Sequence, residues 1–280
     1  MTLPAEVGVV GGGRMGAGIA HAFLAAGARV TLVESSADLA LAAAGRVAQS
    51  LQRAAERGTL TGTAEEARHR LRAADGPAAL SGCGLVVEAV PEDTDLKQAV
   101  LRSVEVAAPD AVLATNTSSL SVDRLADALT RPERLLGLHF FNPVPVSDLV
   151  EVVVGPRTAT DLVGRAEGWV AALGKTAVTV TDSPGFASSR LGVALALEAM
   201  RMLEEGVASA ADIDTAMTLG YRHPTGPLRT TDLVGLDVRL AIAEHLAREL
   251  GPRFEPPAVL RDKVAAGHLG RKTGQGFYSW

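Results

Sequence analysis

The chain has 280 residues, a length that favours two domains over one. Hydrophobic residues make up 47% and charged residues 21%, which is typical of a globular protein, and the formal net charge of -5 argues against nucleic acid as the main partner. The single cysteine, Cys83, excludes an intrachain disulfide and a cysteine-based metal site.

The sequence shows no secretion signal and no membrane segment. The N-terminus leads directly into an apolar run, without a basic segment followed by a signal-peptide core. No apolar run reaches the length that a membrane-spanning helix needs. Together with the lone cysteine, these features predict a soluble, cytoplasmic protein.

The first half of the chain alternates short apolar runs with helix-like stretches. The runs Val7–Val10 and Arg29–Val33 are followed by the helical stretches Met15–Ala26 and Asp38–Glu56. Further strand candidates, mostly bounded by Gly, Pro, Asn or Asp, are Leu85–Val90, Val112–Thr115, Leu135–Phe140, Val150–Val154 and Ala177–Val180. This alternation predicts a parallel sheet with crossover helices.

The strand pattern ends near Pro184-Gly185, and the rest of the chain is predicted to be helical. The expected helices are Phe186–Glu205, Ala210–Leu219, Leu236–Leu250 and Pro257–Ala266. We therefore expect an α/β domain over residues 1–184 and an all-helical domain over residues 185–280.

A glycine-rich turn follows the first strand. The motif GxGxxG, with Gly11, Gly13 and Gly16, stands between a strand and a helix, the order that a dinucleotide-binding fold requires. Gly11 permits the tight turn, Gly13 lets the backbone approach a pyrophosphate, and Gly16 allows helix and strand to pack closely. The motif, with Met15 beside it, predicts a Rossmann-type, doubly wound sheet; the alternative is a turn without a ligand.

The second strand ends in Glu34, about 20 residues after the glycine turn. An acidic side chain at this place accepts hydrogen bonds from the adenine ribose hydroxyls. Ser35 and Ser36 follow, with no adjacent arginine to pair with a 2′-phosphate. The expected cofactor is therefore NAD and not NADP.

His139 and Glu151 are the candidates for proton transfer. His139 stands where a strand ends and a loop begins, and Glu151 lies at the start of the next strand. A strand-loop-strand arrangement would bring the carboxylate against the imidazole, fix its tautomer and stabilise its charged form. Oxidation of an alcohol needs such a base, whereas a lone histidine in an apolar strand is more often a packed structural residue.

The segment Thr115–Ser119 also follows a strand. Its hydroxyls and the Asn116 amide are suited to hydrogen bonds with a ligand oxygen. The alternative is that Ser119 or Ser121 caps the helix Val122–Leu129.

Along nearly its whole length, the chain resembles the 3-hydroxyacyl-CoA dehydrogenase family. The residues that carry the resemblance form five separate motifs: Gly11–Gly16, Glu88–Glu92 with Lys97, Thr115–Ser119, His139–Pro145 with Glu151, and Gly270–Tyr278. The resemblance implies an NAD-dependent oxidoreductase that interconverts (3S)-3-hydroxyacyl-CoA and 3-oxoacyl-CoA by hydride transfer.

The resemblance also implies roles for individual residues. His139 and Glu151 would form the catalytic pair, while Ser118 and Asn142 would hydrogen-bond the reacting oxygen and position the imidazole. The C-terminal domain would close on the substrate and form a homodimer.

For the ligands, the resemblance implies that Glu92, Lys97 and Asn116 lie along NAD. It further implies that Ser50 and Arg57 help to hold the CoA moiety, although the family more often has lysine at the second position.

The sequence departs from the family at Ser189, where the motif Gly-Phe-x-x-Asn-Arg has asparagine. That asparagine contacts the substrate, and a serine would lose one hydrogen bond worth roughly 0.5–1.5 kcal/mol. Three interpretations remain: a tolerated variant acting on acyl-CoA, a specialised substrate such as a carrier-bound hydroxyacyl group or a free hydroxy acid, or a non-catalytic NAD-binding relative.

A different enzyme class opens with a similar glycine turn. The β-hydroxyacid dehydrogenases use a catalytic lysine, for which Lys175 is the candidate here. On that hypothesis His139 and Glu151 would have no role, and Lys175 is interpreted instead as a solvated charge before a strand.

Overall fold

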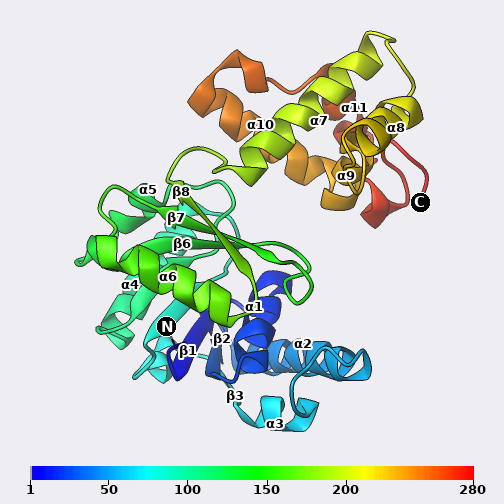
Figure 1. Ribbon diagram of the computed structural model, residues 1–280. Coiled ribbons are helices and arrows are strands. Elements are labelled where there is room, and N and C mark those ends of the chain that lie inside the picture. The colour runs from blue at the N-terminus through cyan, green and yellow to red at the C-terminus, as the bar shows by residue number, and fades with distance from the viewer. Residues whose placement is uncertain (1) are drawn as a thin grey trace. The chain divides into compact units, whose positions relative to one another are not determined.

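A computed structural model describes residues 2–280, which divide into two compact units, residues 2–182 and 183–280 (Figure 1). In the described residues, the first unit contains one eight-stranded sheet. Its strands are β1 (Glu6–Val10), β2 (Arg29–Val33), β3 (Leu71–Ala74), β4 (Leu85–Glu88), β5 (Val112–Thr115), β6 (Leu135–Phe140), β7 (Leu149–Val154) and β8 (Thr176–Thr181).

The strand order is β3-β2-β1-β4-β5-β6-β7-β8. Neighbouring strands run parallel except for β6 and β7, which pair antiparallel. The predicted fold, a mostly parallel, Rossmann-type sheet followed by a helical domain, is confirmed.

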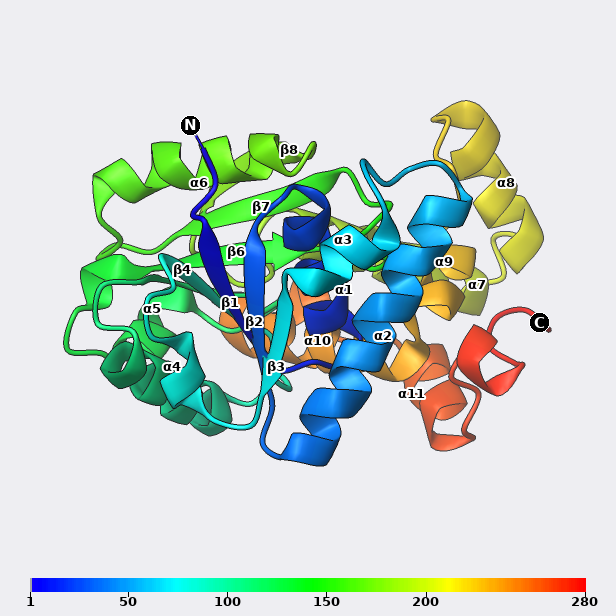
Figure 2. The ribbon, with the colours of Figure 1, turned by 90° about the horizontal axis from the view of Figure 1, so that it is seen from below.

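Helices cover both faces of the sheet (Figure 2). Val7 and Val9 point to one face, because alternate residues of a strand face opposite sides, and they pack in a core shared with three helices, α1 (Arg14–Ala25), α2 (Ala37–Glu56) and α6 (Thr160–Ala172). The helices of this unit are α1 (Arg14–Ala25), α2 (Ala37–Glu56), α3 (Ala64–His69), α4 (Thr94–Ala107), α5 (Val122–Ala126) and α6 (Thr160–Ala172), with the 3₁₀ turns η1 (Pro77–Leu80) and η2 (Pro132–Arg134).

The strand β3 was not predicted from the sequence. Its residues, Leu-Arg-Ala-Ala, include no β-branched or aromatic side chain, so the local preference for a strand is weak. The strand forms at the sheet edge because it pairs in parallel with β2 over four residues. Tertiary pairing therefore outweighs the local signal here.

The second unit is helical and has a core of its own, which includes Leu197, Met200, Leu228 and Leu246. Its elements are α7 (Ser188–Glu204), α8 (Ala210–Gly220), α9 (Pro227–Val234), α10 (Leu236–Leu250) and α11 (Ala258–Ala265), with the 3₁₀ turns η3 (Pro252–Phe254) and η4 (Arg271–Thr273).

The buried carboxylate of Asp232 anchors the C-terminal segment of this unit. It accepts hydrogen bonds from the backbone N–H groups of Phe277 and Tyr278 at 2.8 and 2.9 Å and from the Trp280 indole at 2.8 Å. Phe277 and Tyr278 belong to the Gly270–Tyr278 motif, so part of this motif has a structural role.

Candidate active site

The predicted site residues of the first unit gather where the strands β1 to β6 end. The strand order reverses at β1, which has β2 on one side and β4 on the other. Ligands of open α/β sheets bind outside the carboxyl ends of the strands at such a switch point. The loops after β1, β2, β4, β5 and β6 therefore surround the candidate active site.

The glycine turn between β1 and α1 is shaped for an anion. Gly11 has a φ of 91°, and a Cβ at Gly16 would lie 1.7 Å from the carbonyl oxygen of Gly11, so the loop closes on the helix only without side chains. A Cβ at Gly13 would meet nothing within 4 Å. This open space lies beside the helix N-terminus, where backbone N–H groups bind phosphate.

The Glu34 carboxylate is held against the glycine turn. Its Oε1 accepts a hydrogen bond from the Gly12 backbone N–H at 2.7 Å, and its Oε2 accepts one from Ser35 at 3.2 Å. Glu34 lines a pocket of about 740 Å³, the dinucleotide pocket, together with Gly11, Gly13 and Met15.

Asp75 lines the same pocket and was not predicted from the sequence. It follows β3, which pairs with β2, so the two carboxyl-terminal ends bring Asp75 and Glu34 to one side of the pocket. Because β3 was not predicted, nothing in the sequence placed Asp75 beside Glu34.

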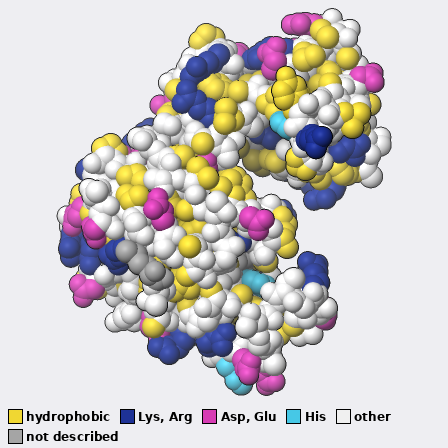
Figure 3. Space-filling model, in the orientation of Figure 1, with side chains coloured by type: hydrophobic (Ala, Val, Ile, Leu, Met, Phe, Trp, Pro, Cys, Tyr) yellow, Lys and Arg dark blue, Asp and Glu magenta, His cyan; other side chains and the backbone are white. Residues whose placement is uncertain are grey.

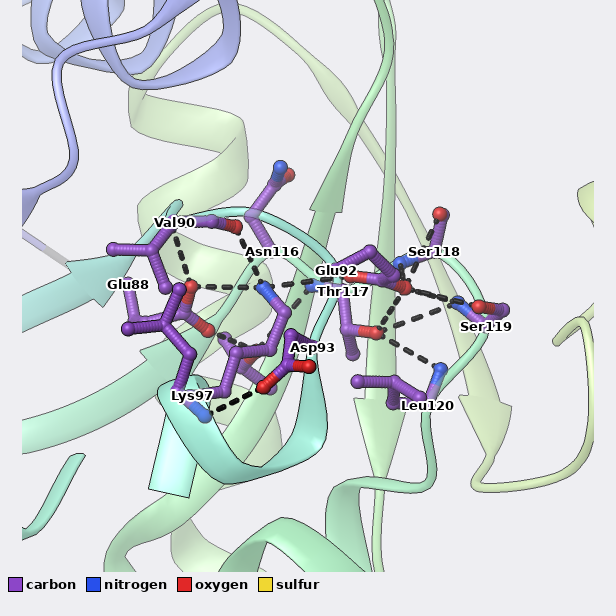
Figure 4. A network of polar contacts seen from close by, with 12 residues as sticks. Glu88, Val90, Glu92, Asp93, Lys97, Asn116, Thr117, Ser118, Ser119 and Leu120 are labelled. Carbon is purple, nitrogen blue, oxygen red and sulfur yellow. Dashed lines mark hydrogen bonds and ion pairs between the residues drawn. The ribbon is translucent and has the colours of Figure 1, made fainter. Parts of the chain in front are cut away.

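A buried ionic network lies beneath the loops after β4 and β5 (Figure 4). Lys97 is 1% exposed, and its Nζ donates to Glu88 Oε1 at 2.8 Å and to the Val90 carbonyl at 3.1 Å. It also lies 3.4 Å from Glu92 Oε2. Since the Lys97 ammonium is enclosed by these partners, it positions the two loops from below, and its contact with a cofactor stays a proposal.

Glu92 joins this network to the loop after β5. Its Oε1 accepts hydrogen bonds from Thr117 Oγ1 at 2.6 Å, from the Ser118 N–H at 2.9 Å and from the Ser119 N–H at 3.0 Å. Burial raises the pKa of Glu92, but the Lys97 charge and these hydrogen bonds outweigh burial and lower the pKa below its ordinary value. The carboxylate is therefore ionised and fixes the loop.

His139 and Glu151 are register partners across the antiparallel strands β6 and β7. The Nδ1 of His139 lies 2.7 Å from Glu151 Oε2, and the two residues are 6% and 0% exposed. The Phe141 ring packs against the imidazole, with centroids 4.4 Å apart. A carboxylate at Nδ1 fixes the tautomer in which Nδ1 carries a proton, so that Nε2 is the basic atom.

The loop after β5 is tied to the histidine strand. Asn116 Oδ1 accepts a hydrogen bond from the backbone N–H of Phe140, the residue after His139, at 2.9 Å. Asn116 therefore positions the end of β6, and its contact with NAD remains a proposal. Ser121, and not Ser119, caps α5, since its hydroxyl accepts from the Arg124 N–H.

The expected contacts of Ser118 and Asn142 with the reacting oxygen and with the imidazole stay a prediction. The N–H and the hydroxyl of Ser118 donate to Glu92, and Asn142 makes no side-chain hydrogen bond within residues 2–280. Glu151 and Phe141 contact the His139 ring, and the pairing of β6 with β7 brings Glu151 against it.

Asn142 lines a second pocket, of about 400 Å³, which we call the arginine pocket. The predicted residues Ser50 and Arg57 line it as well. The pocket has four basic side chains, and no acidic residue stands in the described part of its lining; the four are Arg14, Arg46, Arg53 and Arg57.

Three of these arginines were not predicted, although α2 carries a signal for two of them. Arg46, Ser50, Arg53 and Arg57 are spaced i, i+4, i+7 and i+11, which places them along one face of a helix. The Nε of Arg46 donates to the Gly12 carbonyl at 2.9 Å. The arginine pocket therefore adjoins the glycine turn.

Lys175 has a structural position. Its Nζ donates to the carbonyl oxygens of Val144 and Ser147 at 2.7 and 2.5 Å, and burial lowers its pKa. The interpretation of Lys175 as a solvated charge is wrong, because the ammonium holds the loop that follows β6. That role gives no support to a lysine-based mechanism.

Ser189 belongs to the second unit, where it lies in the first turn of α7. Its hydroxyl makes no hydrogen bond to another described residue.

Within residues 2–280, no cluster of three or more His, Cys, Asp or Glu is arranged to hold a metal ion. None of the described helices is long and apolar enough to cross a membrane.

Family models match both units of the chain. Residues 6–183 match the NAD-binding domain of 3-hydroxyacyl-CoA dehydrogenase, and residues 185–280 match the C-terminal domain of the same family.

Relatives match over nearly the full length. A 3-hydroxybutyryl-CoA dehydrogenase of Mycobacterium tuberculosis is 43% identical, covering 98% of each chain. The mitochondrial hydroxyacyl-coenzyme A dehydrogenase of Rattus norvegicus is 38% identical, covering 98% of this chain and 91% of the relative. The crystal structure of (S)-3-hydroxybutyryl-CoA dehydrogenase PaaH1 from Ralstonia eutropha superimposes with a TM-score of 0.94 at 39% identity, covering 99% of each chain.

Proposed function

The chain belongs to the 3-hydroxyacyl-CoA dehydrogenase family, and we propose that it interconverts (3S)-3-hydroxyacyl-CoA and 3-oxoacyl-CoA with NAD as cofactor. The observation that carries the proposal is the buried His139–Glu151 pair at the ligand-binding edge of the sheet. A short acyl chain fits the relatives, which are named for the hydroxybutyryl ester.

In the oxidative direction, His139 acts as the general base. Its Nε2 takes the proton of the C3 hydroxyl as the C3–H bond breaks and the carbonyl forms. NAD, when bound, would supply the acceptor for the hydride that leaves C3. Glu151 stabilises the imidazolium through Nδ1, and in the reductive direction the imidazolium returns the proton to the oxygen.

Ser118 and Asn142 are the proposed partners of the reacting oxygen. The Glu92 carboxylate holds the loop that carries Ser118, and Asn142 follows β6 three residues after His139. In the second unit, Ser189 on α7 stands where the family has asparagine. Replacing asparagine with serine costs one neutral hydrogen bond. The effect of this loss on the rate is small compared with the effect of a general base, which contributes about 10²–10⁴-fold in rate.

The arginine pocket supports a CoA ester as the substrate. Guanidinium groups bind phosphate through paired N–H donors, and CoA carries a diphosphate and a 3′-phosphate. The arginines of α2 form no ion pair with a carboxylate in the described chain, so their charges are available to a polyanion. A free hydroxy acid would leave this pocket without a ligand.

Glu34 and Asp75 support NAD over NADP. Both carboxylates line the dinucleotide pocket, and Glu34 stands where the adenine ribose is bound in this fold. A 2′-phosphate would meet two negative charges there, so the pocket rejects NADP by repulsion.

We also propose a homodimer located in the cytoplasm. Apolar side chains, yellow in Figure 3, lie on the surface of the helical unit. Leu191, Leu219 and Tyr221 are 71, 77 and 75% exposed. Burial of such side chains against a second copy is favourable. The cytoplasmic location is supported by the single cysteine, which is unpaired and buried.

The test is oxidation of NADH by the purified protein with acetoacetyl-CoA. We expect turnover with NADH, much weaker turnover with NADPH, and a large loss of kcat/KM with the acetoacetyl thioester of pantetheine, which lacks the nucleotide. Bound NADH without turnover of acetoacetyl-CoA would contradict the proposal. Faster turnover of the pantetheine ester than of the CoA ester would move the substrate to a carrier-bound acyl group.

A further inference from the structure

Arg14 lines both the dinucleotide pocket and the arginine pocket. Resting on the proposed function, we propose that its guanidinium bridges the NAD pyrophosphate and a phosphate of CoA, and so couples the binding of the two ligands. It is a specificity-determining residue shared by two sites, and it acts on affinity, not on the hydride transfer.

The position of Arg14 on α1 explains why it reaches both pockets. Ala17 and Gly18, three and four residues further on, line the arginine pocket, so this face of the helix points towards it. Gly13 and Met15, its neighbours in the chain, line the dinucleotide pocket. Arg14 therefore stands on the border between the two pockets.

The Arg14 guanidinium is not held by another part of the described chain. It forms no ion pair and no side-chain hydrogen bond within residues 2–280. As the first residue of α1, it also lies at the positive end of the helix dipole, where a cation is unfavourable and an anion is favoured. An anionic ligand removes this penalty, and here each of the two pockets is suited to one.

The charges around Arg14 differ between the two pockets. Among the described residues that line the dinucleotide pocket, Arg14 is the only basic one, beside the acidic Glu34 and Asp75. In the arginine pocket it is one of four basic residues. Removal of Arg14 should therefore weaken NAD binding through the loss of the only basic side chain in that pocket. It should weaken CoA binding through the loss of one of four basic side chains.

Two bound anions in adjoining pockets repel each other, and a cation between them offsets that repulsion. A guanidinium has five N–H donors in a fixed plane, enough to bind two phosphates at once. The first ligand also orders the long side chain, so the second loses less conformational entropy on binding. By linkage, each ligand then tightens the binding of the other by the same factor.

The experiment measures this factor with NAD⁺ and acetoacetyl-CoA, which are both oxidised and therefore cannot react. Calorimetric titration gives the Kd of NAD⁺ without and with saturating acetoacetyl-CoA, and the ratio is the coupling factor. We expect Arg14→Leu to weaken both ligands and to reduce the coupling factor about fivefold or more. Arg14→Lys, which keeps the charge but loses the planar fork, should retain part of the coupling.

Arg53→Leu is the matched control, because Arg53 lines the arginine pocket only. It should weaken acetoacetyl-CoA while leaving the Kd of NAD⁺ and the coupling factor unchanged. Acetoacetyl-pantetheine is the second control: it lacks the nucleotide phosphates, so its coupling factor should be the same in the parent protein and in Arg14→Leu.

An unchanged coupling factor for acetoacetyl-CoA in Arg14→Leu would overturn the inference, and so would an equal loss in Arg53→Leu. These results differ from a failure of the proposed function, in which the parent protein itself would not turn over acetoacetyl-CoA with NADH.

Discussion

At the residue scale, the chemistry depends on a tautomer. The Glu151 carboxylate is fully buried and has the His139 Nδ1 within 2.7 Å, so the ring presents Nε2 as its base. Lys97 and Glu92 act differently: Lys97 forms a buried ion pair with Glu88, and Glu92 accepts backbone hydrogen bonds from the loop after β5. In the proposed mechanism, His139 is the side chain that reacts and the other residues fix its surroundings.

The first prediction concerns His139. His139→Gln should lower kcat by about 10²–10⁴-fold, because an amide cannot accept the hydroxyl proton. The Kd of NADH, measured by fluorescence titration, should stay within about threefold, since glutamine changes no charge in the dinucleotide pocket. A loss of NADH binding equal to the loss of turnover would mean that the histidine is structural.

His21 is a second buried histidine, and it is not part of the proposed chemistry. It is 4% exposed on α1, and burial followed by the nearby Lys175 charge lowers its pKa below the ordinary value of 6.5. The folded protein therefore keeps His21 neutral while the unfolded chain takes up a proton below about pH 6.5. This contribution to stability is complete above that pH and is lost as the pH falls.

The second prediction concerns the loss of stability that His21 causes as the pH falls. Between about pH 6.5 and the lowered pKa of His21, the free energy of unfolding should fall by at most about 1.4 kcal/mol per pH unit on account of this group. His21→Leu removes the titration, so its urea-unfolding free energies at about pH 7.5 and about pH 5.5 should differ less than those of the parent protein. The same difference in both proteins would exclude His21 as the cause.

At the element scale, the strand-turn-helix segment of β1, the glycine turn and α1 is the part of the fold on which the proposed cofactor binding depends. The turn is fixed by Glu34, whose carboxylate accepts from Gly12, and by the contact of Gly16 with the Gly11 carbonyl. The antiparallel pairing of β6 and β7 has a similar role for the reacting pair. Backbone geometry positions both parts of the site.

The third prediction tests the glycine turn. In Gly16→Ala the new methyl group would lie 1.7 Å from a backbone oxygen, so the turn must shift away from the pyrophosphate position. We expect the Kd of NADH to rise by about tenfold or more, equal to about 1.4 kcal/mol. Gly45→Ala is the control: it lies within α2 with open space around its Cβ position, and it should bind NADH normally.

At the scale of the whole molecule, two units with separate cores carry different tasks. The first contains the dinucleotide pocket, the arginine pocket and the His139–Glu151 pair. The second contributes Ser189 and the exposed apolar residues of α7 and α8. We infer that assembly depends mainly on the second unit.

The fourth prediction is that the protein is a dimer with a mass near twice 28.9 kDa in sedimentation velocity. Leu191→Glu combined with Leu219→Glu should shift the protein towards the monomer, because both side chains are exposed on the helical unit and a buried unpaired charge is costly. Leu41→Glu, at a residue 74% exposed on α2, should leave the mass unchanged. A monomeric parent protein would refute the homodimer.

The sequence alone predicted the fold class, the cofactor turn and the contact between His139 and Glu151, because these depend on short motifs and on local periodicity. The glycine turn, Glu34 and the strands that carry His139 and Glu151 are all readable within segments of a few tens of residues. Only the tertiary structure placed Asp75 in the dinucleotide pocket and Arg14 between two pockets, and only it showed that Ser118 hydrogen-bonds Glu92. Such contacts join loops and helices distant in sequence, and their geometry depends on strand pairing and side-chain packing that no local pattern specifies.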